Sequence, residues 1–247
     1  LATAYYLANT FRQSRIAVLE KGWLGSGNIG RNTTIIRSNY LLPGNEPFYE
    51  FSMKLWEGLE QAFNFNAMVS QRGILNLFHS DGQRDAYRRR GNAMLLAGAD
   101  AELLDRDQVR AMAPFLNFDN ARFPIKGGLL QRRAGTARHD GVAWGYARGA
   151  DMAGVDLIQN CEVTGFRIEG GRIRGVETSR GPIAAGKVGV AVAGSSSRVM
   201  AAAAVSRASN RACSVSVSAN FGSAPKEYST PSFASACVRM LLARLKP

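Results

Sequence analysis

The sequence is short of cysteine, histidine and long apolar runs. Its 247 residues include three cysteines, at positions 161, 213 and 237, and two histidines. So few and so widely spaced thiols exclude a structural zinc site and a disulfide framework, and they favour a reducing, cytoplasmic location. No apolar run approaches the ~20 residues that a membrane helix needs, and the first residues lack the basic region and cleavage site of a signal peptide. We therefore expect no metal site, no membrane contact and a cytoplasmic protein.

Acidic residues are also scarce, since 19 of them face 31 basic residues and leave a net charge of +12. A surplus of this size occurs in nucleic-acid-binding proteins, but there the basic residues cluster. Here most are scattered, and only residues 88–90 form a run of three arginines. We expect no nucleic-acid partner. A basic surface suits an acidic partner subunit or an anionic cofactor equally well.

The beginning of the chain has a pattern typical of dinucleotide-binding units. Residues 1–9 predict an amphipathic helix, residues 15–19 predict a short buried strand, and Glu20 follows at the end of that strand. In such βαβ units an acidic residue follows the glycine fingerprint by about 20 residues and binds the ribose hydroxyls. Counting back places the last glycine before residue 1, so we expect a fragment without its first strand and glycine turn. The alternative for Glu20 is a solvated acid at a strand end.

Helix and strand patterns alternate as far as residue 199, which predicts an α/β fold. A Gly-Gly pair at 170–171 and a glycine at 181 predict the turns of a β-meander. The expected helices cover residues 47–64, 83–97, 105–112 and 140–152; the first has Phe51, Leu55 and Leu59 on one apolar face, and Asp105 is the expected cap of the third. The expected strands cover residues 73–79, 127–131, 154–159, 162–169, 172–178 and 183–192. Residues 200–247, rich in alanine and serine and without a period, predict a disordered or out-of-frame tail with one short helix over 238–245.

Two segments combine residues suited to anionic ligands. In residues 25–40, GSGNIGRNTTIIRSNY, small residues permit close backbone approach, and Arg31 and Arg37 can neutralise phosphate or carboxylate. The pair Ile35–Ile36 indicates that this loop turns inward, although a surface loop is the alternative. In GTARHDGVAW, residues 135–144, His139 precedes an expected helix whose dipole favours a neutral, nucleophilic imidazole, and Asp140 is a candidate helix cap.

On these residues alone, a structural role is expected for His139 more often than a catalytic one. His79 is expected to be an ordinary polar residue at a strand end. The meander offers further candidates. Residues 162–164 are expected in a strand beside an adenine, and residues 188–197 are expected to return to the parallel sheet, with Ala193–Gly194 at its carboxyl end. An ordinary meander with a small-residue exit turn is the alternative.

Six stretches of the first 199 residues are distinctive: LATAYYLA (1–8), IAVLEKGWLGSGN (16–28), GRNTTIIRSNYL (30–41), SQRGILNLFH (70–79), ARHDGVAWGYAR (137–148) and GVDLIQNCEVTGFR (154–167). Together they closely resemble the beta subunits of bacterial heterotetrameric sarcosine oxidases. The resemblance implies a glutathione-reductase-like, Rossmann-type FAD-binding domain over residues 1–45 and 135–199, with part of a mixed-sheet substrate domain over residues 46–134. The tail, 200–247, does not resemble the family.

The resemblance also implies two flavins. It implies noncovalent FAD, and an FMN joined covalently to a histidine that matches His139, with Arg138 beside the flavin or its phosphate. Arg37 matches an arginine that lies near the flavin and the substrate carboxylate in related amine oxidases. The other positions that match FAD contacts are Glu20 for the ribose, Asn28, Arg31, Thr34 and Ile36 in the loop, Val163 beside the adenine, and Gly194 on the returning strand.

The implied reaction is oxidative demethylation of sarcosine to glycine. Hydride passes to FAD, the imine is hydrolysed or its one-carbon unit passes to tetrahydrofolate, and electrons pass through FMN to oxygen. The implied partners are alpha, gamma and delta subunits. The missing glycines, Ser195 where the family usually has histidine, and the unmatched tail predict that the chain alone neither holds FAD tightly nor oxidises sarcosine. A related FAD-dependent amino-acid or N-methyl amine oxidase and an inactive remnant are the alternatives.

Overall fold

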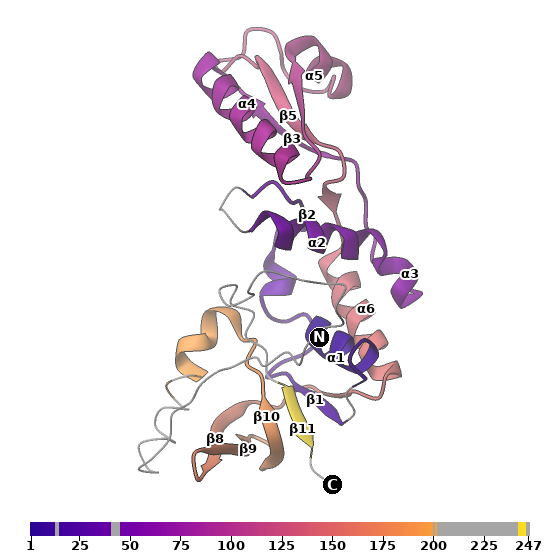
Figure 1. The fold of residues 1–247 in the computed structure, drawn as a ribbon, viewed down its shortest axis with the longest axis vertical. Coiled ribbons are helices and arrows are strands. Elements are labelled where there is room, and N and C mark those ends of the chain that lie inside the picture. The colour runs from indigo at the N-terminus through magenta and orange to yellow at the C-terminus, as the bar shows by residue number, and fades with distance from the viewer. Residues whose placement is uncertain (13–14, 41–44, 200, 202–241, 246–247) are drawn as a thin grey trace. The chain divides into compact units, whose positions relative to one another are not determined.

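The computed structural model describes residues 1–12, 15–40, 45–199, 201 and 242–245 (Figure 1). The chain divides into two compact units, and each is described by itself. Unit 1 contains Leu1–Gly30 and Tyr146–Pro247, and unit 2 contains Arg31–Gly145. The chain returns to unit 1 within helix α6 (His139–Met152). The domain boundaries that the sequence predicts, at 45/46 and 134/135, stay a prediction.

Unit 1 contains a six-stranded mixed sheet in the order β7-β1-β11-β10-β9-β8. Strand β1 (Ile16–Leu19) pairs in parallel with β7 (Asp156–Ile158), as expected when helices connect neighbouring strands. On its other side β1 pairs antiparallel with β11 (Leu242–Leu245). The helix predicted over 238–245 is therefore wrong for its last four residues, because ladder hydrogen bonds to β1 and β10 override a weak local preference. The rest of the predicted tail lies outside the described residues, apart from residue 201.

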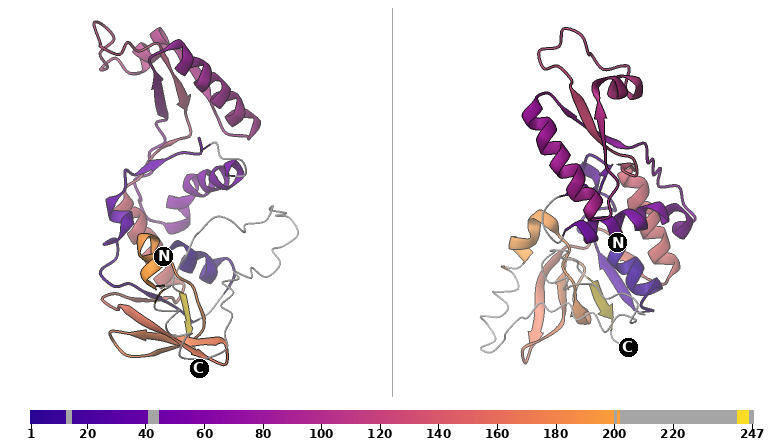
Figure 2. Two further views of the ribbon diagram at one scale, coloured as in Figure 1. Left: turned by 90° about the vertical axis from the view of Figure 1, so that its left-hand side faces the viewer. Right: turned by 45° about the horizontal axis from the view of Figure 1, so that its top comes forward.

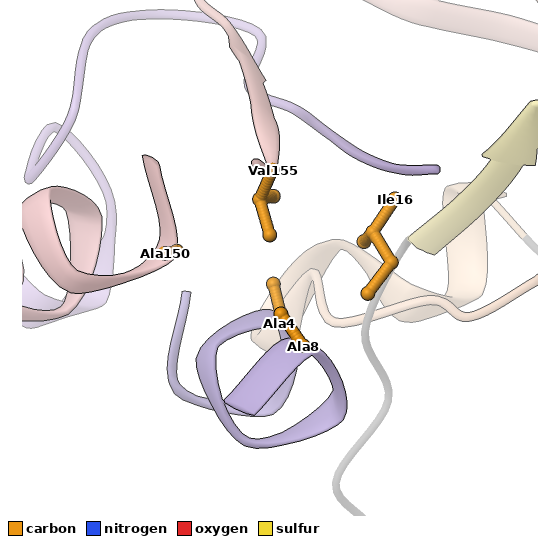
Figure 3. Close-up of a cluster of buried hydrophobic side chains, with 5 residues drawn as sticks. All are labelled: Ala4, Ala8, Ile16, Ala150 and Val155. Carbon is orange, nitrogen blue, oxygen red and sulfur yellow. The ribbon is translucent and has the colours of Figure 1, made fainter. Parts of the chain in front are cut away.

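Small side chains pack helix α1 (Ala2–Asn9) against this sheet and against α6. Ala4 and Ala8 lie one turn apart on α1 and are buried with Ile16, Ala150 and Val155. Figure 3 shows the side chain of Val155 pointing toward Ala4, with Ile16 beside them. Because these alanines lack long side chains, the helix backbone approaches the strands closely. The predicted helix and strand at the start of the chain are confirmed.

The β-meander forms the other end of the sheet (Figures 1 and 2). Its strands are β8 (Val163–Glu169), β9 (Arg172–Thr178) and β10 (Ile183–Val188), joined antiparallel. Gly170 and Gly171 both have positive φ at the tight turn, which explains the Gly-Gly pair. Strand β10 ends four residues earlier than predicted. Beyond it Ala193–Ser195 forms a 3-10 turn, η2, closed by the Ser195 amide donating to the Val192 carbonyl at 2.8 Å, so the predicted return of 188–197 as a strand is wrong.

Unit 2 is built on a three-stranded antiparallel sheet with a helix on each face. The strands are β3 (Ile74–Phe78), β5 (Gly127–Gln131) and β4 (Glu102–Asp105), with β5 in the centre. Leu129 and Leu130 are neighbours in β5 and point to opposite faces. Leu129 packs with Met94 of α4 (Asp81–Leu96), and Leu130 packs with Val109 of α5 (Arg106–Met112). The sequence predicted these elements except β4.

The helix expected over 47–64 is two helices, α2 (Glu46–Glu57) and α3 (Leu59–Phe63), separated at Gly58. Of the predicted apolar face, Leu59 is buried, whereas Phe51 is 51% exposed and Met53, at 1% exposure, is buried in α2. The predicted cap of α5 is confirmed, because Asp105 and Gln108 form a reciprocal capping box. None of the described helices combines the length and the apolar character that a membrane span requires.

A two-stranded sheet brings the loop after residue 30 to the start of α6. Strand β2 (Ile35–Ile36) pairs antiparallel with β6 (Gly135–Thr136), and neither was predicted. Ser70 also exchanges two backbone hydrogen bonds with Thr136, at 2.8 and 2.9 Å. The segment that contains Arg37 and the segment that contains His139 therefore belong to one hydrogen-bonded assembly within unit 2.

Candidate functional site

In unit 1, Glu20 lies at the carboxyl end of the parallel pair β1–β7, where nucleotide-binding sheets place their ligands. Its amide donates to the Ile158 carbonyl and its carbonyl accepts from the Cys161 amide, each at 2.9 Å. The Gly22 amide donates to Oε1 of the Glu20 side chain at 2.9 Å. The orientation of the Glu20 carboxylate is thus fixed by a backbone amide two residues further along the chain. The sequence placed Glu20 at this strand end, and its ribose contact stays a prediction.

The glycine-rich loop after Glu20 is tightly closed. The Asn160 amide donates to the Gly22 carbonyl at 2.8 Å, and the Leu24 amide donates to Oε1 of Gln159 at 2.7 Å. A Cβ on Gly30 would lie 2.4 Å from the Gly25 carbonyl oxygen, so only glycine fits there. Asn28 and Arg31, the ends of the 3-10 turn η1 (Asn28–Arg31), are both exposed.

The start of helix α1 shares its surroundings with Glu20. The Glu20 carboxylate lies close enough to interact electrostatically with the Leu1 nitrogen, at the start of this helix. In dinucleotide-binding units the pyrophosphate lies at this helix end. The two other predicted contacts in unit 1 lie elsewhere along the chain. Val163 is the half-buried first residue of β8, and Gly194 lies in the turn η2.

In unit 2, the predicted inward turn of the loop holds for one residue of the pair. Ile36 is buried, whereas Ile35 is 47% exposed, because successive strand residues point to opposite sides. Thr34 has a φ of 61°, and its carbonyl accepts from the Ala137 amide at 3.1 Å. This hydrogen bond joins the loop backbone to Ala137, which lies two residues before His139 in the chain.

His139 is the first residue of α6 and is partly buried. Its Nδ1 atom is buried and has no hydrogen-bond partner among the described residues. A buried ring nitrogen without a partner is uncommon, since buried polar atoms are normally satisfied. The sequence placed His139 at this helix start but did not predict that one of its nitrogens is left unpaired.

Arg138 and Asp140, on either side of His139, form a two-point ion pair. Nε and Nη2 of Arg138 donate to the two carboxylate oxygens at 2.8 and 2.7 Å. The guanidinium, together with the Gly141 amide, holds the pKa of the Asp140 carboxyl well below its usual range. Asp140 lies inside the first turn of α6, so its predicted role as the helix cap is wrong. The Asp140 carboxylate instead accepts hydrogen bonds from the neighbouring Arg138 guanidinium.

Arg37 lines a small cavity of about 130 Å³ in unit 2. Its guanidinium lies over the Tyr40 ring, 5.0 Å from the centroid, and Tyr40 stacks on Tyr49 with centroids 4.1 Å apart. Among the described residues no carboxylate pairs with Arg37. The remaining lining residues are Ile35, Ile36, Ser52, Met53 and Trp56. An arginine in a largely apolar pocket without a counter-ion is suited to an anionic ligand.

The sequence singled out Arg37 but missed the pocket walls from α2. Tyr49, Met53 and Trp56 lie in a segment that was predicted only as a helix. Their i, i+4 and i+7 spacing is a signal for one helix face, but that spacing does not reveal which segment the face contacts.

Residues 1–223 match the family described as FAD dependent oxidoreductase, and the chain belongs to this family. It is a homologue of sarcosine oxidase beta subunits. It is 76% identical over 199 residues to the sarcosine oxidase subunit beta of Rhizobium meliloti, a match that covers 81% of this chain and 48% of the relative. The Arthrobacter sp protein of the same name is 52% identical over 198 residues, or 80% of this chain and 49% of the relative. The chain spans about half the length of these curated relatives.

Solved structures support the same fold. An L-proline dehydrogenase from P. horikoshii superposes with a TM-score of 0.74 at 25% identity, covering 82% of this chain and 52% of that one. A glycine oxidase from Bacillus cereus superposes with a TM-score of 0.70 at 20% identity, covering 81% and 55%. The predicted α/β fold class and the predicted family resemblance are confirmed.

Proposed function

We propose that this chain contributes FAD contacts and a substrate-carboxylate site to an enzyme that demethylates sarcosine to glycine. The observation behind the proposal is Arg37, an arginine with which no described carboxylate pairs, in a small and largely apolar pocket. Over 199 residues the chain is 76% identical to a sarcosine oxidase beta subunit. A planar guanidinium binds a carboxylate through two parallel hydrogen bonds. The Tyr40 ring beneath it restricts its plane, so less rotamer entropy is lost when a carboxylate binds.

The residues of unit 1 fit part of an FAD site. One oxygen of Glu20 accepts from Gly22, which leaves the other to accept a ribose hydroxyl. A Cβ on Gly27 would meet nothing within 4 Å, so the loop backbone there is open to close approach by a ligand. When bound, FAD supplies the hydride acceptor, and the protein orients it. We assign the further FAD contacts, as proposals, to Asn28, Arg31, Thr34, Ile36, Val163 and Gly194.

The residues around His139 fit a covalently held FMN. The unpaired Nδ1 is a ring nitrogen that no described residue engages, and a neutral imidazole nitrogen is nucleophilic. When bound, FMN supplies the path for electrons to oxygen. Arg138 already pairs with Asp140, which neutralises its charge and fixes its position. Its proposed role is to lie in this fixed position beside the flavin or its phosphate. Alpha, gamma and delta subunits, and tetrahydrofolate as one-carbon acceptor, belong to the same proposal.

A binding experiment tests the substrate site directly. Calorimetric titration of sarcosine into the FAD-loaded protein, assembled with its partner subunits, should give binding, whereas sarcosinamide, which lacks the carboxylate, should not bind. Arg37→Gln should weaken sarcosine binding by about tenfold or more, as expected for a lost charge-assisted pair. Unchanged binding by Arg37→Gln would overturn the carboxylate site.

A second candidate is a related amino-acid oxidoreductase. A D-amino acid dehydrogenase of Cereibacter sphaeroides is 37% identical over 131 residues, covering 53% of this chain and 30% of that protein. The same titration with D-alanine separates the two, because stronger binding of D-alanine than of sarcosine would favour this candidate. If the chain binds neither amino acid and no FAD, the inactive remnant is the better description.

A further inference from the structure

A buried polar cluster lies directly beside the Arg37 pocket. Ser38, Asn39 and Gln131 are the polar residues that are buried in the described part of the chain, each at 1–2% exposure. Burial of polar groups costs free energy unless hydrogen bonds replace their water contacts. Two of the three satisfy each other. Gln131 Nε2 donates to Ser38 Oγ at 2.6 Å, and the Ser38 amide donates to Gln131 Oε1 at 3.2 Å.

The Ser38 hydroxyl extends this pairing to helix α2. Its Oγ donates to Oε2 of Glu50 at 3.1 Å. Glu50, whose side chain is 12% exposed, also pairs with the Arg133 guanidinium, and Nε of Arg133 donates to Oε1 of Glu57 at 2.7 Å. Glu50 and Glu57 lie two turns apart on α2, so Arg133 binds the helix at two points along its length.

The same helix supplies Tyr49, the residue before Glu50, to the pocket. Tyr49 stacks on Tyr40, and Tyr40 lies beneath the Arg37 guanidinium. Ser38 stands in the chain between the two stacked residues of the loop. A hydrogen bond between Ser38 and Glu50 therefore fixes the loop to α2 at the point where the three-residue stack forms.

We propose that Ser38 is a positioning residue for the substrate carboxylate. Through Gln131 on β5 and Glu50 on α2, it holds the Arg37–Tyr40 segment against Tyr49 and so orients the guanidinium before a carboxylate arrives. This inference rests on the proposed function of Arg37. Pre-orientation increases affinity by removing the cost of ordering side chains on binding.

The test compares Ser38→Ala with Ser38→Thr in the full chain. Ser38→Ala removes the hydroxyl and keeps the backbone hydrogen bond, whereas Ser38→Thr restores a hydroxyl. Ser80→Ala is the matched control, because Ser80 Oγ likewise makes a hydrogen bond, to the Gln83 amide at 3.2 Å, but at the start of α4 and outside the cluster. Sarcosine affinity is measured by calorimetry on the FAD-loaded protein, with each variant chain assembled with its partner subunits. The tyrosine near-ultraviolet circular dichroism of each chain without sarcosine reports the stack.

We expect Ser38→Ala to weaken sarcosine binding roughly two- to tenfold, the equivalent of one hydrogen bond, and to change the tyrosine signal. Ser38→Thr should restore both, and Ser80→Ala should lower thermal stability without changing either. A Ser38→Ala chain with the wild-type affinity and tyrosine signal overturns the positioning role even if Arg37→Gln abolishes binding. Conversely, if Arg37→Gln binds like wild type while Ser38→Ala changes the tyrosine signal, the proposed carboxylate site fails and the structural coupling stands.

Discussion

The carbonyl oxygen of Ser70 lies 1.9 Å from the position that a Cβ atom on residue 135 would occupy, so Gly135 is the residue that this crossing requires. The two backbone hydrogen bonds between Ser70 and Thr136 form at the same place. Gly135 also pairs with Ile36 in the β2–β6 ladder. The glycine therefore determines how closely three segments of unit 2 approach one another.

Gly135→Ala should destabilise the chain by about 3 kcal/mol, because the added methyl group forces the two strands apart and breaks their hydrogen bonds. Thermal and denaturant unfolding measure the change. Gly82→Ala is the control, since a Cβ there meets nothing within 4 Å and lies in α4. That variant should gain about 0.5–1 kcal/mol. Equal effects of the two variants would contradict the crossing argument.

His139→Ala should abolish any flavin that stays attached to the chain. The holoprotein, assembled with its partner subunits, is denatured in acid and separated by gel electrophoresis, and flavin fluorescence is recorded in the band. His79→Ala is the matched control, because His79 is likewise partly buried, directly follows β3, and has its Nδ1 3.2 Å from the Pro124 carbonyl oxygen. It should keep the signal. Fluorescence that persists in His139→Ala would place the attachment elsewhere.

Tyr146 should make the protein less stable at alkaline pH. Burial, followed by the hydrogen bond with Tyr6, raises the pKa of the Tyr146 phenol above its ordinary value. The unfolded chain ionises this phenol near pH ~10 while the folded chain does not. The contribution of the protonated Tyr146 phenol to the free energy of unfolding is therefore complete below that pH and decreases as the pH rises above it.

Denaturant unfolding at about pH 9 and about pH 11 measures this effect, and Tyr146→Phe should lose roughly 1 kcal/mol less than wild type between the two. Absorbance at the tyrosinate band provides an independent check. If all tyrosines of the folded protein ionise with ordinary pKa values, burial does not raise the pKa of the Tyr146 phenol.

Asp105→Ala should remove the capping box of α5 and lower stability by about 1 kcal/mol. Asp105 Oδ1 accepts from the Gln108 amide at 2.8 Å, and Gln108 Oε1 accepts from the Asp105 amide at 2.9 Å. Asp107→Ala, in the first turn of the same helix but outside the box, is the control and should have a smaller effect. Equal thermal shifts for the two variants would contradict the cap.

The sequence predicted those features whose cause is local. The apolar run before Glu20, the Gly170–Gly171 turn and the Asp105 cap each depend on residues a few positions apart, and the structure has them. Features that depend on distant partners were missed or wrong. Strands β2 and β6 have two residues each and exist only because they pair with one another.

The candidate site divides in the same way. Arg37 and His139 were singled out from their neighbours in the sequence. The stack of Tyr40 on Tyr49 and the pairing of Ser38 with Gln131 join residues up to 93 positions apart, and no local period encodes such contacts. The exposure of Phe51 shows the same limit, because which face of α2 is buried depends on the loop that it meets.

The alanines between α1, α6 and the sheet restrict how this chain can change over time. Ala4, Ala8 and Ala150 are at most 8% exposed and share one contact region with Ile16 and Val155. A bulkier residue at any of the three has nowhere to expand unless an opposing side chain shrinks in the same lineage. Accepted substitutions in this layer should therefore occur as compensating pairs, with total volume preserved, whatever reaction the protein performs.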